Sequence, residues 1–136
     1  MRVALTGATG FIGRYIAHHL AEQGHSLRCW SRASSNRAAC DSIEDLKWVE
    51  GELGDRNSAC ELVADCDAVV HSALWRQGER FMGSEGDVLD FAEKNILGTL
   101  QLIQAARDAG AGRFVFISTC AVHDKILDDR LPVSYT

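Results

Sequence analysis

Three glycines placed directly after a short apolar run constrain the fold of this chain more than any other feature. Residues 2–6 read Arg-Val-Ala-Leu-Thr, and Gly7, Gly10 and Gly13 follow at intervals of three. Apolar residues then recur every four positions between residues 12 and 20, on one face of a helix. A strand, a glycine turn and a helix in this order begin a βαβ unit.

Each glycine of this turn has a mechanical reason to be there. Gly7 permits a tight turn, Gly10 lets a pyrophosphate approach the backbone, and Gly13 lets the helix pack close to the strand. Free backbone N–H groups and the positive end of the helix then face the phosphates. We therefore expect an NAD(P) cofactor here, against the alternative of a plain turn with incidental glycines. The same predicted site includes Thr9, Phe11 and Ile12.

Short apolar runs alternate with helical patterns along the rest of the chain, which is typical of a parallel sheet. Further strands are predicted at residues 27–31, 47–50, 67–71 and 114–117, and helices at residues 57–64 and 86–109. With right-handed crossovers, five strands predict an α/β, doubly wound parallel sheet of the Rossmann type in the order 3-2-1-4-5. Its ligand crevice would lie at the carboxyl ends of strands one and four. Residues 1–136 are expected to form one such domain.

The charge and the apolar pattern argue against two classes of partner. The 136 residues carry a formal net charge of -5 with both signs scattered along the chain, so we expect no DNA or RNA partner. No run approaches the ~20 apolar residues of a membrane span, and the first apolar stretch is shorter than a signal-peptide core. We expect no membrane partner and a cytoplasmic location.

Five cysteines are present, an odd number without a Cys-x-x-Cys pair or a nearby histidine at ligand spacing. They indicate neither a metal site nor a disulfide framework. We expect free thiols at these positions: Cys29, Cys40, Cys60, Cys66 and Cys120.

The spacing of the glycine turn also points to a family. The segment Thr6-Gly-Ala-Thr-Gly-Phe-Ile-Gly13 closely resembles the extended short-chain dehydrogenase/reductase family, the NAD(P)-dependent epimerases and dehydratases. The resemblance extends in order through four further segments, at residues 52–55, 70–74, 95–99 and 116–122. It implies hydride transfer on a nucleotide-sugar or a similar small-molecule carbonyl or alcohol substrate.

The resemblance assigns roles to residues at three strand ends. Glu52 stands where the family has an aspartate that meets the adenine amino group, and Leu53 would flank the adenine ring. His71, Ser72 and Ala73 match the family segment that lines the cofactor after the fourth strand. For His71 a second interpretation stays open, a buried structural histidine with only its backbone near the cofactor. In the same way, the matching asparagine at position 95 could simply be a polar residue early in a long helix.

Cofactor choice depends on the end of the second strand. An acidic residue there would bind the ribose hydroxyls of NAD and repel a 2′-phosphate, whereas this chain has Ser31 and Arg32, with Arg37 nearby. We expect NADP, with NAD as the alternative. Arg32 as a solvated loop residue is also open.

In the family, a hydroxyl at the position of Thr119 binds the substrate, and the tyrosine of a Tyr-x-x-x-Lys motif moves the proton. Tyr135 is the only tyrosine after Thr119, but the sequence stops at Thr136, before a lysine could follow at the required spacing, and Lys125 precedes it. We therefore name Thr119 and Tyr135 as catalytic candidates, with a terminal Tyr135 of no function as the alternative.

The resemblance also implies parts that the 136 residues do not include. Family enzymes continue with a sixth strand and a substrate domain, so we expect a truncated Rossmann domain, either a fragment or a short gene product. The alternative to the enzyme part is a non-catalytic NADP-binding module without turnover. A homodimer stays open for the full-length form.

Overall fold

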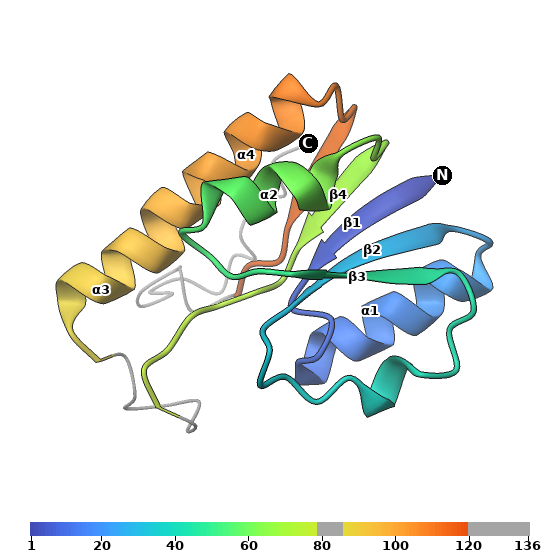
Figure 1. Cartoon of the computed structure of the whole chain (residues 1–136), viewed down its shortest axis with the longest axis horizontal. Coiled ribbons are helices and arrows are strands. Elements are labelled where there is room, and N and C mark those ends of the chain that lie inside the picture. The colour runs from blue at the N-terminus through green and yellow to red at the C-terminus, as the bar shows by residue number, and fades with distance from the viewer. Residues whose placement is uncertain (79–85, 120–136) are drawn as a thin grey trace, which may run out of the picture.

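The strands of the sheet all run parallel, in the order β3-β2-β1-β4-β5 (Figure 1). The computed structural model describes residues 1–78 and 86–119 of the chain. The strands are β1 (Arg2–Thr6), β2 (Ser26–Ser31), β3 (Leu46–Glu50), β4 (Ala68–His71) and β5 (Arg113–Phe116). The helices are α1 (Phe11–Glu22), η1 (Ala38–Cys40), α2 (Arg56–Val63), α3 (Val88–Ala92), η2 (Glu93–Leu97) and α4 (Gly98–Asp108). The predicted Rossmann-type sheet and its strand order are confirmed.

Separate hydrophobic cores lie on the two faces of the sheet. Helix α1 covers one face, and α2 and α4 lie side by side over the other (Figure 1). Successive residues of β1 point to opposite faces, so Ala4 joins the core beneath α2 and α4, whereas Val3 and Leu5 join the core beneath α1. A strand buried on both faces has the near-continuous apolar sequence that residues 2–6 display.

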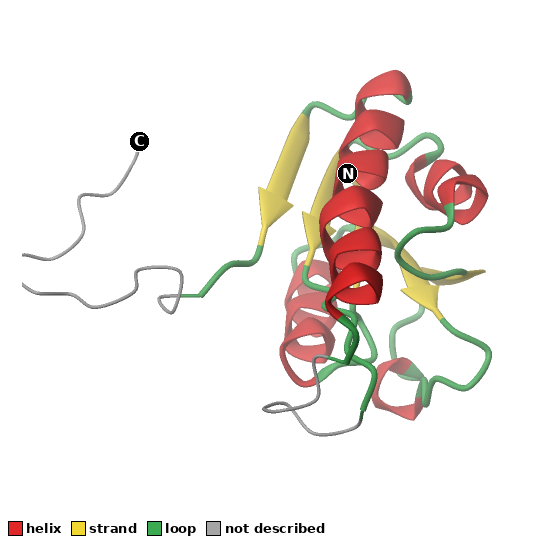
Figure 2. Ribbon diagram, turned by 90° about the vertical axis from the view of Figure 1, so that its left-hand side faces the viewer, coloured by secondary structure: helices red, strands yellow, loops and turns green. Residues whose placement is uncertain are grey.

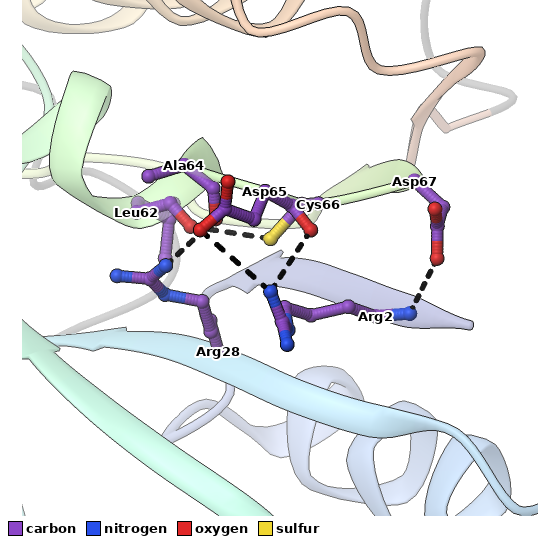
Figure 3. Close-up of polar contacts among 7 residues, drawn as sticks. All are labelled: Arg2, Arg28, Leu62, Ala64, Asp65, Cys66 and Asp67. Carbon is purple, nitrogen blue, oxygen red and sulfur yellow. Dashed lines mark hydrogen bonds and ion pairs between the residues drawn. The ribbon is translucent and has the colours of Figure 1, made fainter.

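Polar contacts fix β1 against its neighbours at the amino end of the sheet (Figure 3). The backbone N–H of Arg2 donates to Asp67 Oδ2 at 2.7 Å, and Arg2 Nη1 donates to the carbonyl of Asp65 at 3.3 Å. Arg28 Nη1 on β2 reaches the carbonyl of Ala64 at 2.7 Å. These contacts tie β1 and β2 to the turn before β4, and they agree with a register that pairs the last residues of β1 and β4 at the opposite edge.

The helix predicted over residues 86–109 is built from three segments. Figure 2 shows α3, η2 and α4 as one continuous column, in which η2 is a π-helical turn. The apolar stripe that predicts this helix faces outward, since Leu89 is 75% exposed and Leu100 is 57% exposed. The buried face of α4 carries mainly small residues instead: Gly98, Leu102, Ala105 and Ala106. The periodicity therefore finds the helix but not the face that packs.

Gly98 lets α4 approach the loop that follows β3. A Cβ atom at this position would lie 2.7 Å from the backbone nitrogen of Gly54 and 3.2 Å from the carbonyl carbon of Leu53. Both neighbours are main-chain atoms, which cannot move aside as a flexible side chain can. Gly98 therefore sets the position of the loop that carries Glu52 and Leu53.

We predict that Gly98→Ala lowers the free energy of unfolding by about 2 kcal/mol, because the added methyl group overpacks this contact. Alanine is otherwise favoured over glycine inside a helix by about 1 kcal/mol, so helix propensity alone would give the opposite sign. Gly112→Ala is the matched control, since its Cβ would lie 3.8 Å from the nearest carbonyl oxygen, that of Asp67. Urea unfolding measures both variants. Equal stability of the two would contradict the close packing.

Candidate functional site

An open crevice lies at the carboxyl edge of the sheet, lined by residues at or after the ends of β1, β2, β3 and β4. Six of the residues predicted from the sequence line it: Gly7, Thr9, Ser31, Arg32, Glu52 and Leu53. Three apolar side chains outside the named candidate residues line it as well: Trp30, Leu74 and Trp75, of which only Leu74 lies in a segment matched to the family. The structure thus brings together residues from the ends of four strands at the edge where the fold predicts a ligand.

The glycine turn at this edge has no room for side chains. Gly7 has a φ of +76°, and a Cβ there would lie 2.7 Å from Ser72 Oγ and 2.8 Å from the backbone nitrogen of Ala73. A Cβ on Gly13 would overlap the carbonyl group of Gly7, so α1 packs directly on the turn. Gly10 is less crowded, because its Cβ would lie 3.1 Å from the Gly7 oxygen.

The first turn of α1 directly follows Gly7 and Thr9, which line the crevice, but Gly10, Phe11, Ile12 and Gly13 themselves are not among its lining residues. Gly10 is the N-cap residue and supplies no side-chain hydrogen bond, so the first N–H groups of the helix lack a cap. The side chains of Phe11 and Ile12 are 73% and 56% exposed. Uncapped N–H groups at a positive helix end form a site for an anionic group such as phosphate.

His71 lies at the centre of a buried hydrogen-bond chain. Thr99 Oγ1 donates to the carbonyl of Asn95 at 2.6 Å, so it accepts from His71 Nε2 at 2.9 Å. The other ring nitrogen, Nδ1, is then unprotonated and accepts from Thr6 Oγ1 at 2.6 Å. These directions fix the neutral tautomer of His71, which is 1% exposed.

The same threonine also orients the backbone after β4. Thr6 Oγ1 accepts from the N–H groups of Ser72 and Ala73, at 3.2 and 3.1 Å. Ser72 Oγ donates in turn to the carbonyl of Thr6 at 2.7 Å. The ends of β1 and β4 are therefore joined through side chains beyond the last ladder pair, Thr6 and His71.

Burial lowers the pKa of His71 to about 4. The ring also packs edge-on against Phe114 and Phe116, with centroid distances of 6.1 and 5.4 Å. The described contacts of the imidazole are all with side chains of the protein interior and of β5, which favours the structural interpretation of this histidine. Its contribution to the crevice is to hold the following backbone, at Ser72 and Ala73, in place.

Asn95 holds the loop after β4 against the helix column. Its Oδ1 accepts from the N–H of Trp75 at 2.7 Å, and its Nδ2 donates to the carbonyls of Trp75 and Phe91, each at 3.0 Å. A plain polar residue early in a helix would not need these three hydrogen bonds, so they favour a specific structural role for Asn95. Asn95 fixes the position of Trp75 at the crevice.

The end of β2 presents a buried hydroxyl and an exposed cation. Ser31 is 3% exposed, and its Oγ has no hydrogen-bond partner among the described residues. Arg32 is exposed, and its backbone N–H donates to Ser35 Oγ at 3.1 Å in the following turn. Arg37 instead stacks on the ring of Trp48 at 5.3 Å and does not line the crevice.

The end of β3 carries an ion pair that the sequence did not predict. Glu52 Oε1 lies 3.1 Å from Nζ of Lys94, a residue of η2. Leu53 is 4% exposed and belongs to the core beneath α2 and α4. Nothing in the sequence pattern pairs two residues so far apart, and only the packing of η2 on this loop reveals the contact.

Of the two catalytic candidates, the structure describes only Thr119. Thr119 is exposed and lies just after β5, at the carboxyl edge of the sheet. Tyr135 and Lys125 fall outside the described residues. Their predicted roles are therefore not tested by the structure.

The part of the chain that the structure describes contains no cluster of three or more His, Cys, Asp or Glu side chains placed to hold a metal ion. No helix in that part is long and apolar enough to cross a membrane. The described cysteines are free thiols, as predicted, and burial raises the pKa of Cys29, Cys40 and Cys66. Cys120 lies outside the described residues.

The depressed pKa of His71 predicts a loss of stability in mild acid. Because the folded-state pKa lies below the unfolded value, the unfolded chain binds more protons between pH 6.5 and 4, and stability falls as pH is lowered through this window. Between pH 7 and 5 we expect a loss of about 2 kcal/mol from this group. Urea unfolding should show that loss in the native chain and in His19→Gln, an exposed control, but not in His71→Gln.

An equal acid loss in His71→Gln would contradict this account. A direct titration of the imidazole by NMR gives the same test without a substitution, because the ring should stay neutral down to about pH 4.

Comparison with known proteins agrees with this geometry. The profile of the NAD dependent epimerase/dehydratase family matches residues 3–132. The chain is 35% identical over 136 residues to the Low-salt glycan biosynthesis protein Agl12 of Haloferax volcanii, covering 96% of this chain and 43% of that protein. It is 31% identical over 132 residues to a UDP-glucose 4-epimerase of Klebsiella pneumoniae, covering 90% of this chain and 92% of that protein.

Solved structures show the same relationship. A UDP-glucose-4-epimerase from Stenotrophomonas maltophila, with bound NAD and formylated UDP-arabinopyranose, is 28% identical with a TM-score of 0.79, covering 98% of this chain and 40% of that chain. The chain spans only 43%, 34% and 32% of the length of the first curated relatives it matches. The resemblance inferred from the ordered motifs is thus confirmed, and the chain belongs to the NAD dependent epimerase/dehydratase family.

Proposed function

We propose that this chain is the NADP-binding part of an epimerase, dehydratase or reductase that acts by hydride transfer on a nucleotide-sugar or a similar carbonyl or alcohol substrate. The observation that carries the proposal is the crevice itself. Gly7 and Thr9 of the glycine turn line it, and this turn leads directly into the uncapped first turn of α1. A dinucleotide would place its pyrophosphate there and extend its adenosine half toward the ends of β2 and β3.

The choice of NADP over NAD rests on the end of β2. Ser31 Oγ is buried, without a hydrogen-bond partner among the described residues, and lines the crevice, so it is available to a ribose or phosphate oxygen. Arg32 at the rim supplies a positive charge. Glu50 and Glu52 border the same rim, but Lys94 offsets the charge of Glu52. A 2′-phosphate between Ser31 and Arg32 is therefore the group that this strand end suits best.

The substrate class is supported by the relatives. The Klebsiella relative is named as a UDP-glucose 4-epimerase, and a dTDP-glucose 4,6-dehydratase of Streptomyces antibioticus is 31% identical over 142 residues. Thr119 and Tyr135 remain the proposed substrate-side residues, with Thr119 orienting the reacting oxygen. A non-catalytic nucleotide-binding module remains the second candidate. A homodimer also remains a prediction.

We predict that the chain binds NADPH at least about tenfold more tightly than NADH, the range expected for a charge-assisted hydrogen bond. Arg32→Asp should reverse the preference, because a carboxylate would repel the 2′-phosphate and accept from the ribose hydroxyls of NADH. Arg37→Asp changes the net charge equally at a residue stacked on Trp48, and it should leave the preference unchanged. Isothermal titration calorimetry measures all three chains. Equal affinities in the native chain would overturn the NADP assignment.

We further predict that Gly10→Val abolishes dinucleotide binding but preserves the fold. Gly10 has an extended backbone with a φ of -82°, which valine also adopts, and the Cβ, 3.1 Å from the Gly7 oxygen, needs only a small shift of the turn. The branched side chain would instead fill the space where the pyrophosphate meets the turn. Calorimetry with NADPH and circular dichroism measure the two effects. Undiminished affinity in a folded variant would mean that the glycine turn does not bind phosphate.

A further inference from the structure

Two consecutive residues of η2 hold the loops on either side of the crevice. Asn95 bonds both backbone groups of Trp75, in the loop after β4. Lys94 reaches across to Glu52, in the loop after β3. The π-helical turn that carries both residues is a rare conformation that occurs often at functional sites. Glu52, Leu53 and Trp75 all line the crevice, so η2 fixes two of its walls.

The stem of Lys94 is itself supported. Gly54 has a φ of +90°, and a Cβ there would lie 3.2 Å from Cδ of Lys94, so the aliphatic chain lies against this part of the turn. The Lys94 side chain is 30% exposed and that of Glu52 is 45% exposed. The ammonium group is thus placed by packing, and it holds a carboxylate that would otherwise sample several rotamers.

Only one oxygen of Glu52 is used by this ion pair. Oε1 accepts from Lys94, and no described residue donates a hydrogen bond to Oε2. A carboxylate in this orientation accepts hydrogen bonds but cannot donate them. It therefore suits an exocyclic amino group, such as that of adenine, and repels a keto oxygen at the same ring position.

We propose that Lys94 is a positioning residue that fixes Glu52 for the amino group of the adenine ring and so sets the preference of the site for adenine over hypoxanthine. The proposal rests on the proposed binding of a dinucleotide, and it adds the element that orders the base-reading side chain. If Lys94 were purely structural, its substitution would weaken the binding of both dinucleotides equally. If Lys94 positions Glu52, its substitution changes the ratio of the two affinities.

The test compares NADP with nicotinamide hypoxanthine dinucleotide phosphate, in which a keto oxygen replaces the exocyclic amino group and the neighbouring ring nitrogen N1 carries a proton. Calorimetry on the 136-residue chain gives the ratio of the two dissociation constants. Lys94→Met keeps the aliphatic stem but removes the charge. It should lower the preference for adenine, the dissociation constant of the hypoxanthine dinucleotide divided by that of NADP, about two- to fivefold, the range for a partly exposed ion pair. Lys94→Arg should retain the ratio. Glu52→Gln should abolish the discrimination, because an amide can either accept or donate.

A second measurement avoids substitutions altogether. Salt screens a partly exposed ion pair, so the adenine preference of the native chain should fall between low and high ionic strength, while the salt effect on the shared phosphates cancels in the ratio. Equal weakening of both dinucleotides in Lys94→Met, or a native chain that binds both equally, would overturn the role of Lys94 and leave dinucleotide binding intact. A native chain that binds neither dinucleotide would overturn the proposed function, and the role of Lys94 with it.

Discussion

The hydrogen-bond chain through His71 is the constraint on which the carboxyl edge of this fold depends. It links Thr6 at the end of β1 to Thr99 on α4, and it requires a neutral imidazole with one ring nitrogen donating and the other accepting. Because Thr6 also accepts from the backbone after β4, the chain aligns two strands, one helix and one loop at a single point. Buried polar networks are costly when partly satisfied, so this one specifies a single arrangement.

The hydrogen-bond chain through His71 and the helix column of α3, η2 and α4 together determine the shape of the crevice. The glycine turn can pass close to Ser72 and Ala73 only because the backbone there is held by Thr6. Farther out, Asn95 of η2 fixes Trp75. The walls are thus set before any ligand arrives, which reduces the entropy that binding must overcome. A preformed crevice that contains a buried hydroxyl, and whose glycine turn leads into a helix end with uncapped N–H groups, suits an extended, phosphate-linked ligand.

The sequence predicted the features that depend on local chemistry. The glycine turn, the strand order and the element bounds follow from spacing and turn residues, and the bounds of β2 to β5 and α2 agree with prediction to within one residue. It missed what depends on packing between distant segments. The pair of Glu52 and Lys94 has no local signature, and the apolar stripe through Leu100 indicated a buried face where α4 in fact buries small residues. A helix that packs closely on its neighbours needs small side chains at the contact, and hydrophobic periodicity does not detect such residues.

The proposed function requires that the glycine turn and the first turn of α1 bind the phosphates of a dinucleotide. Titration of the 15N-labelled chain with NADPH, followed by amide NMR, tests it most directly. We predict that the largest shifts occur at Gly7, Gly10, Phe11 and Ile12, with smaller shifts at Ser31 and Leu53. Shifts concentrated instead around His18 and His25, which line a separate pocket beside α1, or no shifts at millimolar NADPH, would contradict it.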